Sequence, residues 1–130
     1  MKTAHIQPKE IKVKDADVLI GLMERRFAPL LIKIIVYMAN RWGLVMTESY
    51  REKRHMNDLH GCQPVRAVDL RSWCYGSESA ARLIADEINS MWSYDPTRPR
   101  LKVALLHKVS GGAYHFHIQV SDKTIRRGYA

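Results

Sequence analysis

Apolar residues recur every three or four positions in three stretches of the chain, which predicts three amphipathic helices. Each stretch opens with a residue that favours the first turn of a helix. In chain order, the helices begin at Asp15 or Asp17, at Pro29, and at Ser77 or Ser79. The second should end near Gly43 and the third near Trp92. In the first helix the apolar residues at helical spacing are Val18, Leu19, Leu22 and Met23. The predicted buried residues of the other two are Leu30, Leu31, Ile34, Ile35, Met38, Ala81, Ile84, Ala85 and Ile88.

Shorter stretches with alternating or β-branched residues predict four strands, over residues 44–49, 65–70, 101–107 and 114–120. The last two should form a hairpin around residues 110–112, because Ser-Gly-Gly suits a tight reversal. Residues 52–63 and 94–99 are rich in turn-forming residues and should be loops. This order of elements indicates an α+β fold, in which helices pack on a small antiparallel sheet.

Length and composition fit a single domain over residues 1–130, since 46% hydrophobic content is enough for a packed core. Residues 1–14 and 123–130 are polar and basic, and we expect them to be flexible. Cys62 and Cys74 are too few for a disulfide framework and should stay reduced. No signal peptide is visible, and the most apolar run is short and interrupted by Lys33. We therefore expect synthesis in the cytoplasm and no stable membrane insertion.

The net charge of +8 favours an anionic partner. Nucleic acid, anionic lipid and an acidic polymer such as a bacterial wall all satisfy this condition, and a solvated basic surface would give the same charge. No recognition helix or base-stacking motif supports nucleic acid. A basic nucleic-acid-binding protein therefore stays an alternative that explains the charge alone.

Two histidines, His115 and His117, occupy alternate positions of the last predicted strand and should project from the same face of the sheet. The pattern is weak by itself, because two histidines on a wet strand face would look the same. We expect His55 and His107 to be surface or packing residues. His107 lies on the predicted hairpin partner of this strand, however, so it could line a site there.

Asp69 lies inside an apolar run, where an unpaired carboxylate would be costly. Arg66 or Arg71 could supply its partner, and so could a metal ion. Zinc accepts histidine nitrogen and aspartate oxygen, and catalytic zinc sites combine three protein ligands with a water. His60, Asp69 and one histidine of the hairpin would make such a set. Cys62, two residues from His60, is a rival ligand.

These residues and the segments around them resemble the D-alanyl-D-alanine carboxypeptidase-type zinc peptidases, whose superfamily includes lysostaphin-type enzymes and the sonic hedgehog fold. The likeness runs from about Phe27 to Val120 and is strongest to small phage and prophage peptidoglycan peptidases. The segments that carry it are Leu44-Val45-Met46-Thr47-Glu48-Ser49-Tyr50-Arg51, His60-Gly61, Pro64-Val65-Arg66-Ala67-Val68-Asp69-Leu70-Arg71 and His115-Phe116-His117-Ile118-Gln119-Val120.

The resemblance implies a hedgehog/D-Ala-D-Ala peptidase-like fold and a Zn²⁺ ion bound by His60, Asp69 and His117. It implies that His115 acts beside the metal as a base or transition-state stabiliser, and that Arg51 faces the substrate. The implied activity is that of a zinc metallopeptidase, an endopeptidase or carboxypeptidase that cleaves a peptidoglycan peptide. Such a hydrolase would act in cell wall degradation after release from the cytoplasm, as an endolysin of a bacteriophage or prophage, or as part of a virion.

The sequence also departs from the family pattern. Eight residues separate His60 from Asp69, more than is usual in the family, and Asp58 stands where a serine is common. The Glu-x-x-His general base of many members is missing before His115, which favours the branch in which a histidine does that work. A non-catalytic, zinc-binding member of the superfamily stays open as an alternative.

Three tryptophans could serve either the core or a sugar platform, and we expect core positions for Trp42, Trp73 and Trp92.

Overall fold

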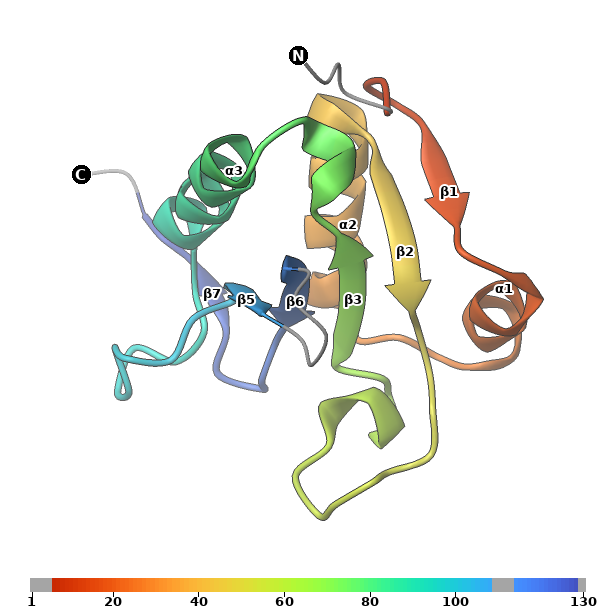
Figure 1. The fold of residues 1–130 in the computed structure, drawn as a ribbon. Coiled ribbons are helices and arrows are strands. Elements are labelled where there is room, and N and C mark those ends of the chain that lie inside the picture. Colours follow the sequence, from red (N-terminus) through yellow and green to blue (C-terminus); the bar gives the residue numbers. More distant parts are fainter. Residues whose placement is uncertain (1–5, 109–113, 129–130) are drawn as a thin grey trace.

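The computed structural model describes residues 6–108 and 114–128, and within them the chain forms two sheets and three α-helices (Figure 1). The larger sheet has the strand order β1-β2-β3-β6-β5. Its strands are β1 (Ile11–Val13), β2 (Leu44–Glu48), β3 (Ala67–Arg71), β6 (Tyr114–Gln119) and β5 (Ala104–Lys108). β1 runs parallel to β2, and the other neighbours are antiparallel. The predicted α+β class is confirmed, but the sheet is mixed and not wholly antiparallel.

The helices begin where the sequence predicts. They are α1 (Ala16–Glu24), α2 (Pro29–Trp42) and α3 (Glu78–Met91). The Asp15 carboxylate accepts a hydrogen bond from the backbone N–H of Val18 at 3.1 Å and caps α1. The Ser77 hydroxyl accepts one from Ala80 at 3.1 Å and caps α3. Pro29 opens α2, because its missing N–H costs nothing in the first turn.

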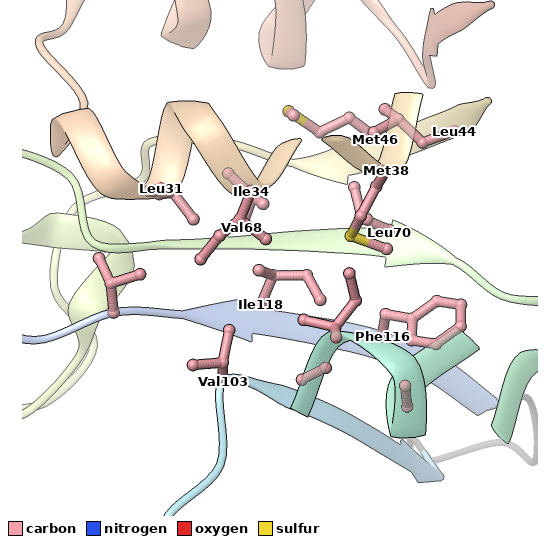
Figure 2. Close-up of a cluster of buried hydrophobic side chains, with 14 of the residues drawn as sticks. Leu31, Ile34, Met38, Leu44, Met46, Val68, Leu70, Val103, Phe116 and Ile118 are labelled. Atoms are coloured by element: carbon pink, nitrogen blue, oxygen red, sulfur yellow. The ribbon is translucent and has the colours of Figure 1, made fainter. Parts of the chain in front are cut away.

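Helix α2 packs on one face of the larger sheet, and Figure 2 shows Leu31, Ile34 and Met38 among the strand side chains that bury them. The strand members of this cluster are fully buried as well: Leu44, Met46, Val68, Leu70, Phe116 and Ile118. Helix α3 adds its predicted residues Ala81, Ile84, Ala85 and Ile88. Each fully buried large apolar side chain contributes about 1.5–3 kcal/mol to folding. The helices cover this face and leave the other one open to polar residues.

Helix α1 buries only part of its apolar stripe. Val18 is buried, whereas Leu19 and Met23, which recur with it at helical spacing, are 45% and 76% exposed. The helix also buries Gly21, and the Ser49 hydroxyl donates a hydrogen bond to the Val18 carbonyl at 2.8 Å. A Cβ on Gly21 would collide with the Ser49 side chain, so the missing side chain permits this close approach.

The structure places strands in both terminal segments, where the sequence predicted none. Within residues 6–14, β1 extends the sheet and the backbone N–H of Lys9 donates to the Ala39 carbonyl at 2.7 Å. Near the other end, β7 (Ile125–Arg126) pairs with β4 (Trp92–Ser93), and these two strands form the smaller sheet. Both terminal strands are short and mostly exposed, so their pairing depends mainly on backbone hydrogen bonds.

Three further expectations concern a turn, a loop and membrane-spanning helices. The turn predicted at residues 110–112 lies outside the described residues. The predicted loop over residues 52–63 contains one turn of 3₁₀-helix, Leu59–Gly61. No helix in the described part of the chain has the length and apolar content needed to cross a membrane.

The junction between α2 and β2 gives a test of how the N-terminal segment packs. Gly43 has a φ of 75° and a ψ of 164°, a conformation that only glycine adopts without strain. A Cβ there would also collide with the Gln7 carbonyl and the Ile6 side chain. We therefore expect Gly43→Ala to lower the free energy of unfolding by about 1–3 kcal/mol. Urea denaturation measures it, with Gly128→Ala as the control because nothing lies near a Cβ at that position. Equal effects of the two substitutions would contradict this packing.

Candidate metal centre

Strand β6 turns alternate side chains to opposite faces of the sheet. Phe116 and Ile118 are fully buried in the core beneath the helices. His115, His117 and Gln119 are partly buried and occupy the alternate positions. The predicted placement of both histidines on one face is therefore confirmed.

The register of the sheet aligns these histidines with polar residues of the neighbouring strands. Asp69 of β3 lies opposite His117, and Arg71 lies opposite His115. On the other side of β6, His107 of β5 lies opposite His115. One row across the sheet thus contains Asp69 and His117, and the next row contains Arg71, His115 and His107.

His60 approaches from the loop that precedes β3. It belongs to the 3₁₀ turn, which Asp58 caps by accepting the backbone N–H of His60 at 3.2 Å. Asp58 is itself buried and also accepts the backbone N–H of Arg54 at 3.1 Å. Burial acts to raise the pKa of Asp58, but these hydrogen bonds and the charge of Arg51 hold it below its usual range. The ionised Asp58 carboxylate therefore stabilises the turn that positions His60.

The imidazoles of His60 and His117 converge on one oxygen atom of Asp69. His60 Nε2 lies 3.2 Å from Asp69 Oδ1, and His117 Nδ1 lies 2.9 Å from the same oxygen. His60 is 1% exposed, and Asp69 is buried beside it. The potential ligand atoms of the three residues all lie within 4.8 Å of one another, so together they could hold a metal ion.

The outer nitrogens of both imidazoles are already hydrogen-bonded to carbonyl oxygens. His60 Nδ1 lies 2.9 Å from the Ser49 carbonyl oxygen, which can only accept, so this nitrogen carries a proton. His117 Nε2 lies 3.2 Å from Gln119 Oε1. The Gln119 amide donates to the Lys102 carbonyl at 2.8 Å, which orients its oxygen toward His117. His117 Nε2 therefore also carries a proton.

With those protons on the outer nitrogens, His60 or His117 can donate to Asp69 only if its inner nitrogen also carries a proton, and otherwise that nitrogen faces the carboxylate with a lone pair. Burial acts to raise the pKa of Asp69, but hydrogen bonds from His117 and His60 bring it well below its usual range. The carboxylate is therefore ionised, and the group needs positive charge at its centre. Extra protons on the imidazoles or a bound cation would supply it. The outer hydrogen bonds match those that orient metal-binding histidines in general.

The other predicted site residues lie close to this group. His115 is not a member of it, and its Nε2 is 2.7 Å from His107 Nε2. Burial lowers the pKa of His115, and the charge of Asp69 acts in the opposite direction. His107, expected at the surface or in packing, is exposed and lines the same cavity of about 640 Å³ as His115.

Arg51 also lines this cavity, and three carboxylates surround its guanidinium. It lies 3.0 Å from Glu48, 3.3 Å from Asp58 and 3.9 Å from Asp69. Its backbone N–H donates to the His60 carbonyl at 3.3 Å. Arg51 therefore links β2, the capped turn and the carboxylate of the site, while its expected contact with substrate stays a prediction.

Arg71, one of the two arginines proposed as a partner for Asp69, makes no ion pair with it in the described residues. Arg66 instead donates to the Val120 carbonyl at 3.1 Å. Cys62 donates a long hydrogen bond of 3.8 Å to the Asp58 carbonyl and does not belong to the possible metal group. Cys74 is buried, and both thiols are free.

The tryptophans divide between the core and the cavity. Trp92 is buried in the core and Trp42 packs against it, as expected. Trp73 is 51% exposed and lines the cavity, so the expected core position is wrong for this residue. It lies in a second 3₁₀ turn, Trp73–Tyr75, which follows the end of β3.

Two contributors to the site were missed by the sequence analysis. Gln119 follows His117 by two residues on a strand, so the same alternation that paired the histidines could have found it. Ser49 contributes its backbone carbonyl. Every residue has one, so the sequence gives no sign that this carbonyl contacts His60.

Comparison of this chain with protein-family models, with curated proteins and with solved structures gives no match. The resemblance to zinc peptidases therefore depends on the segments quoted above. What the chain can do must be argued from the geometry of these side chains.

The ligand assignment can be tested by metal content. We expect the wild type to retain one equivalent of metal after dialysis, and His60→Ala, Asp69→Ala and His117→Ala each to lose it, because two ligands bind far more weakly than three. Inductively coupled plasma mass spectrometry measures this, and circular dichroism checks the fold. His55→Ala, at an exposed position lining the cavity, is the control. A folded variant of His60 or His117 with full metal content would refute the assignment.

Gln119 provides a finer test of the outer hydrogen bonds. We expect Gln119→Leu to weaken metal binding about 10- to 100-fold, because His117 Nε2–H loses its acceptor and the ring is no longer oriented. Competition with a chromogenic chelator measures the affinity. The same substitution at exposed Gln63 is the control. Indistinguishable affinities for the two variants would show that the Gln119 contact is incidental.

Proposed function

We propose that this protein is a zinc metallopeptidase that hydrolyses an amide bond in the stem or cross-bridge peptide of peptidoglycan. The observation that supports it most directly is the arrangement of His60 and His117. Their outer N–H groups are bound to carbonyl oxygens while their inner nitrogens meet Asp69 at an open cavity. Two imidazoles and a carboxylate with room for a water are a typical ligand set of catalytic zinc. A hedgehog/D-Ala-D-Ala peptidase-like fold is part of the proposal.

The choice of peptidoglycan as the substrate rests on the resemblance to phage and prophage peptidases. The net charge of the protein is consistent with that choice. A net charge of +8 favours approach to an anionic cell wall. The protein would act as an endolysin or a virion-associated lysin.

Zinc held by the three residues would lower the pKa of a bound water toward 7 and polarise the substrate carbonyl. The chain's own acid–base group is His115, which lies in the row next to the ligands and lines the cavity. In this proposal its ring accepts the proton of the attacking water and returns it to the leaving amine. His107 can share that proton, because the two Nε2 atoms are within hydrogen-bond distance.

Arg51 has a positioning role in this scheme. It bridges the carboxylates of Glu48, Asp58 and Asp69, and so connects the turn carrying His60 to the strand carrying Asp69. Because it also lines the cavity, it is the candidate for contact with the oxyanion that develops on the substrate.

The most discriminating test of this proposal is to separate metal binding from turnover. We expect His115→Ala to keep the fold and the metal, while peptidoglycan hydrolysis falls by about 10²–10⁴-fold, the usual contribution of a positioned acid–base group. The loss should lie in kcat, because the missing interaction acts in the transition state. Turbidity loss of purified peptidoglycan and metal content are measured together, with His55→Ala as the control.

Two results would count against this role. Near-normal turnover by His115→Ala would make the residue a bystander, and loss of metal would make it a ligand. Wild-type protein that holds zinc but degrades no peptidoglycan would indicate a zinc-binding protein without catalysis.

A further inference from the structure

Four lysine and arginine side chains line the cavity at the candidate metal centre, and their partners differ. Arg51 is surrounded by three carboxylates, whereas Lys14 and Arg54 are exposed at the rim. Arg71 is partly buried, and in residues 6–108 and 114–128 no carboxylate lies within ion-pair distance of it. A fixed cation without an anionic partner, next to a proposed catalytic centre, is a candidate binding group for substrate.

The position of Arg71 is set from two sides. It is the last residue of β3 and lies opposite His115, so its backbone is held by the sheet. Its guanidinium Cζ lies 4.5 Å from the ring centroid of Trp73. A cation–π contact uses the face of the guanidinium and leaves the N–H groups along its edges available. Those edges match the two oxygens of a carboxylate.

The spacing along the strand limits where that carboxylate can lie on the substrate. Arg71 follows Asp69 by two residues, which on a strand is about 6.7 Å. One extended peptide residue covers about 3.5 Å, and a charge-assisted N–H···O bond about 2.8 Å. If zinc held by the three ligands positioned the amide carbonyl beside Asp69 and His117, a carboxylate one residue away would lie within reach of Arg71.

We infer that Arg71, supported by Trp73, binds a carboxylate of the substrate one residue from the scissile amide. The inference rests on the proposed function, because it takes the metal centre as the site of cleavage. It makes Arg71 a specificity-determining residue that selects acidic stem peptides over amidated ones. A carboxamide has no charge and only one acceptor oxygen, so it cannot form the paired hydrogen bonds.

A binding experiment tests this apart from cleavage when it is run under conditions in which mass spectrometry finds the peptides intact. The ligands are a peptidoglycan stem pentapeptide and two versions of it, with a carboxamide either at the C-terminus or at the internal D-glutamate. Calorimetric titration of the zinc-loaded wild type should show about 10- to 100-fold weaker binding of one amidated peptide, the usual worth of a hydrogen-bonded charge. Which version binds weakly identifies the carboxylate.

Three variants make the test specific. We expect Arg71→Gln to bind all three peptides alike, and Arg71→Lys to keep part of the preference, because lysine keeps the charge but not the planar pair of donors. Lys14→Gln removes the same charge from the rim and should keep the full preference. Zinc content and thermal melting show whether each variant is folded.

The outcomes separate this inference from the proposed function. Equal binding of the three peptides by the wild type, no measurable binding, or a preference that survives in folded Arg71→Gln would overturn the assignment of Arg71. Hydrolysis of the same peptides is then followed by mass spectrometry. If the wild type binds selectively but cleaves nothing, the proposed catalysis fails while the carboxylate site stands.

Discussion

A carboxylate oxygen held between two imidazoles, each already hydrogen-bonded on its far side, is the interaction on which the polar face of this protein depends. Asp69 Oδ1 cannot be satisfied by His60 and His117 unless positive charge enters the group, because both outer nitrogens already carry protons. Ser49 and Gln119 fix that protonation pattern through carbonyl oxygens. Asp69 Oδ1 and the inner nitrogens of His60 and His117 would then be three acceptor atoms facing one another. A cation between them would satisfy all three.

The scaffold keeps these groups in place because they lie on packed elements. Helices α2 and α3 bury the opposite face of the sheet, so the strands that carry Asp69 and His117 have little freedom to move. His60 comes from a loop. The capped 3₁₀ turn and the ion pairs of Arg51 restrict the movement of that loop. Sites held on strands and helices are more exact than sites on free loops.

The sequence could predict what depends on side-chain periodicity and not what depends on the backbone. Helical spacing identified the buried face of α3, and strand alternation paired His115 with His117. It could not reveal β1 and β7, whose short exposed strands form through backbone hydrogen bonds, or the Ser49 carbonyl behind His60. The metal group itself required the strand register, because His60, Asp69 and His117 come from three separate segments.

X-ray absorption spectroscopy of the zinc-loaded protein can identify the metal ligands without reference to activity. We expect two imidazole nitrogens at about 2.0–2.1 Å, with the remaining positions filled by oxygen at about 2.0–2.2 Å. A sulfur scatterer at about 2.3 Å would place Cys62 or Cys74 on the metal and contradict the assignment. Failure of the folded protein to bind zinc at all would contradict the account as a whole.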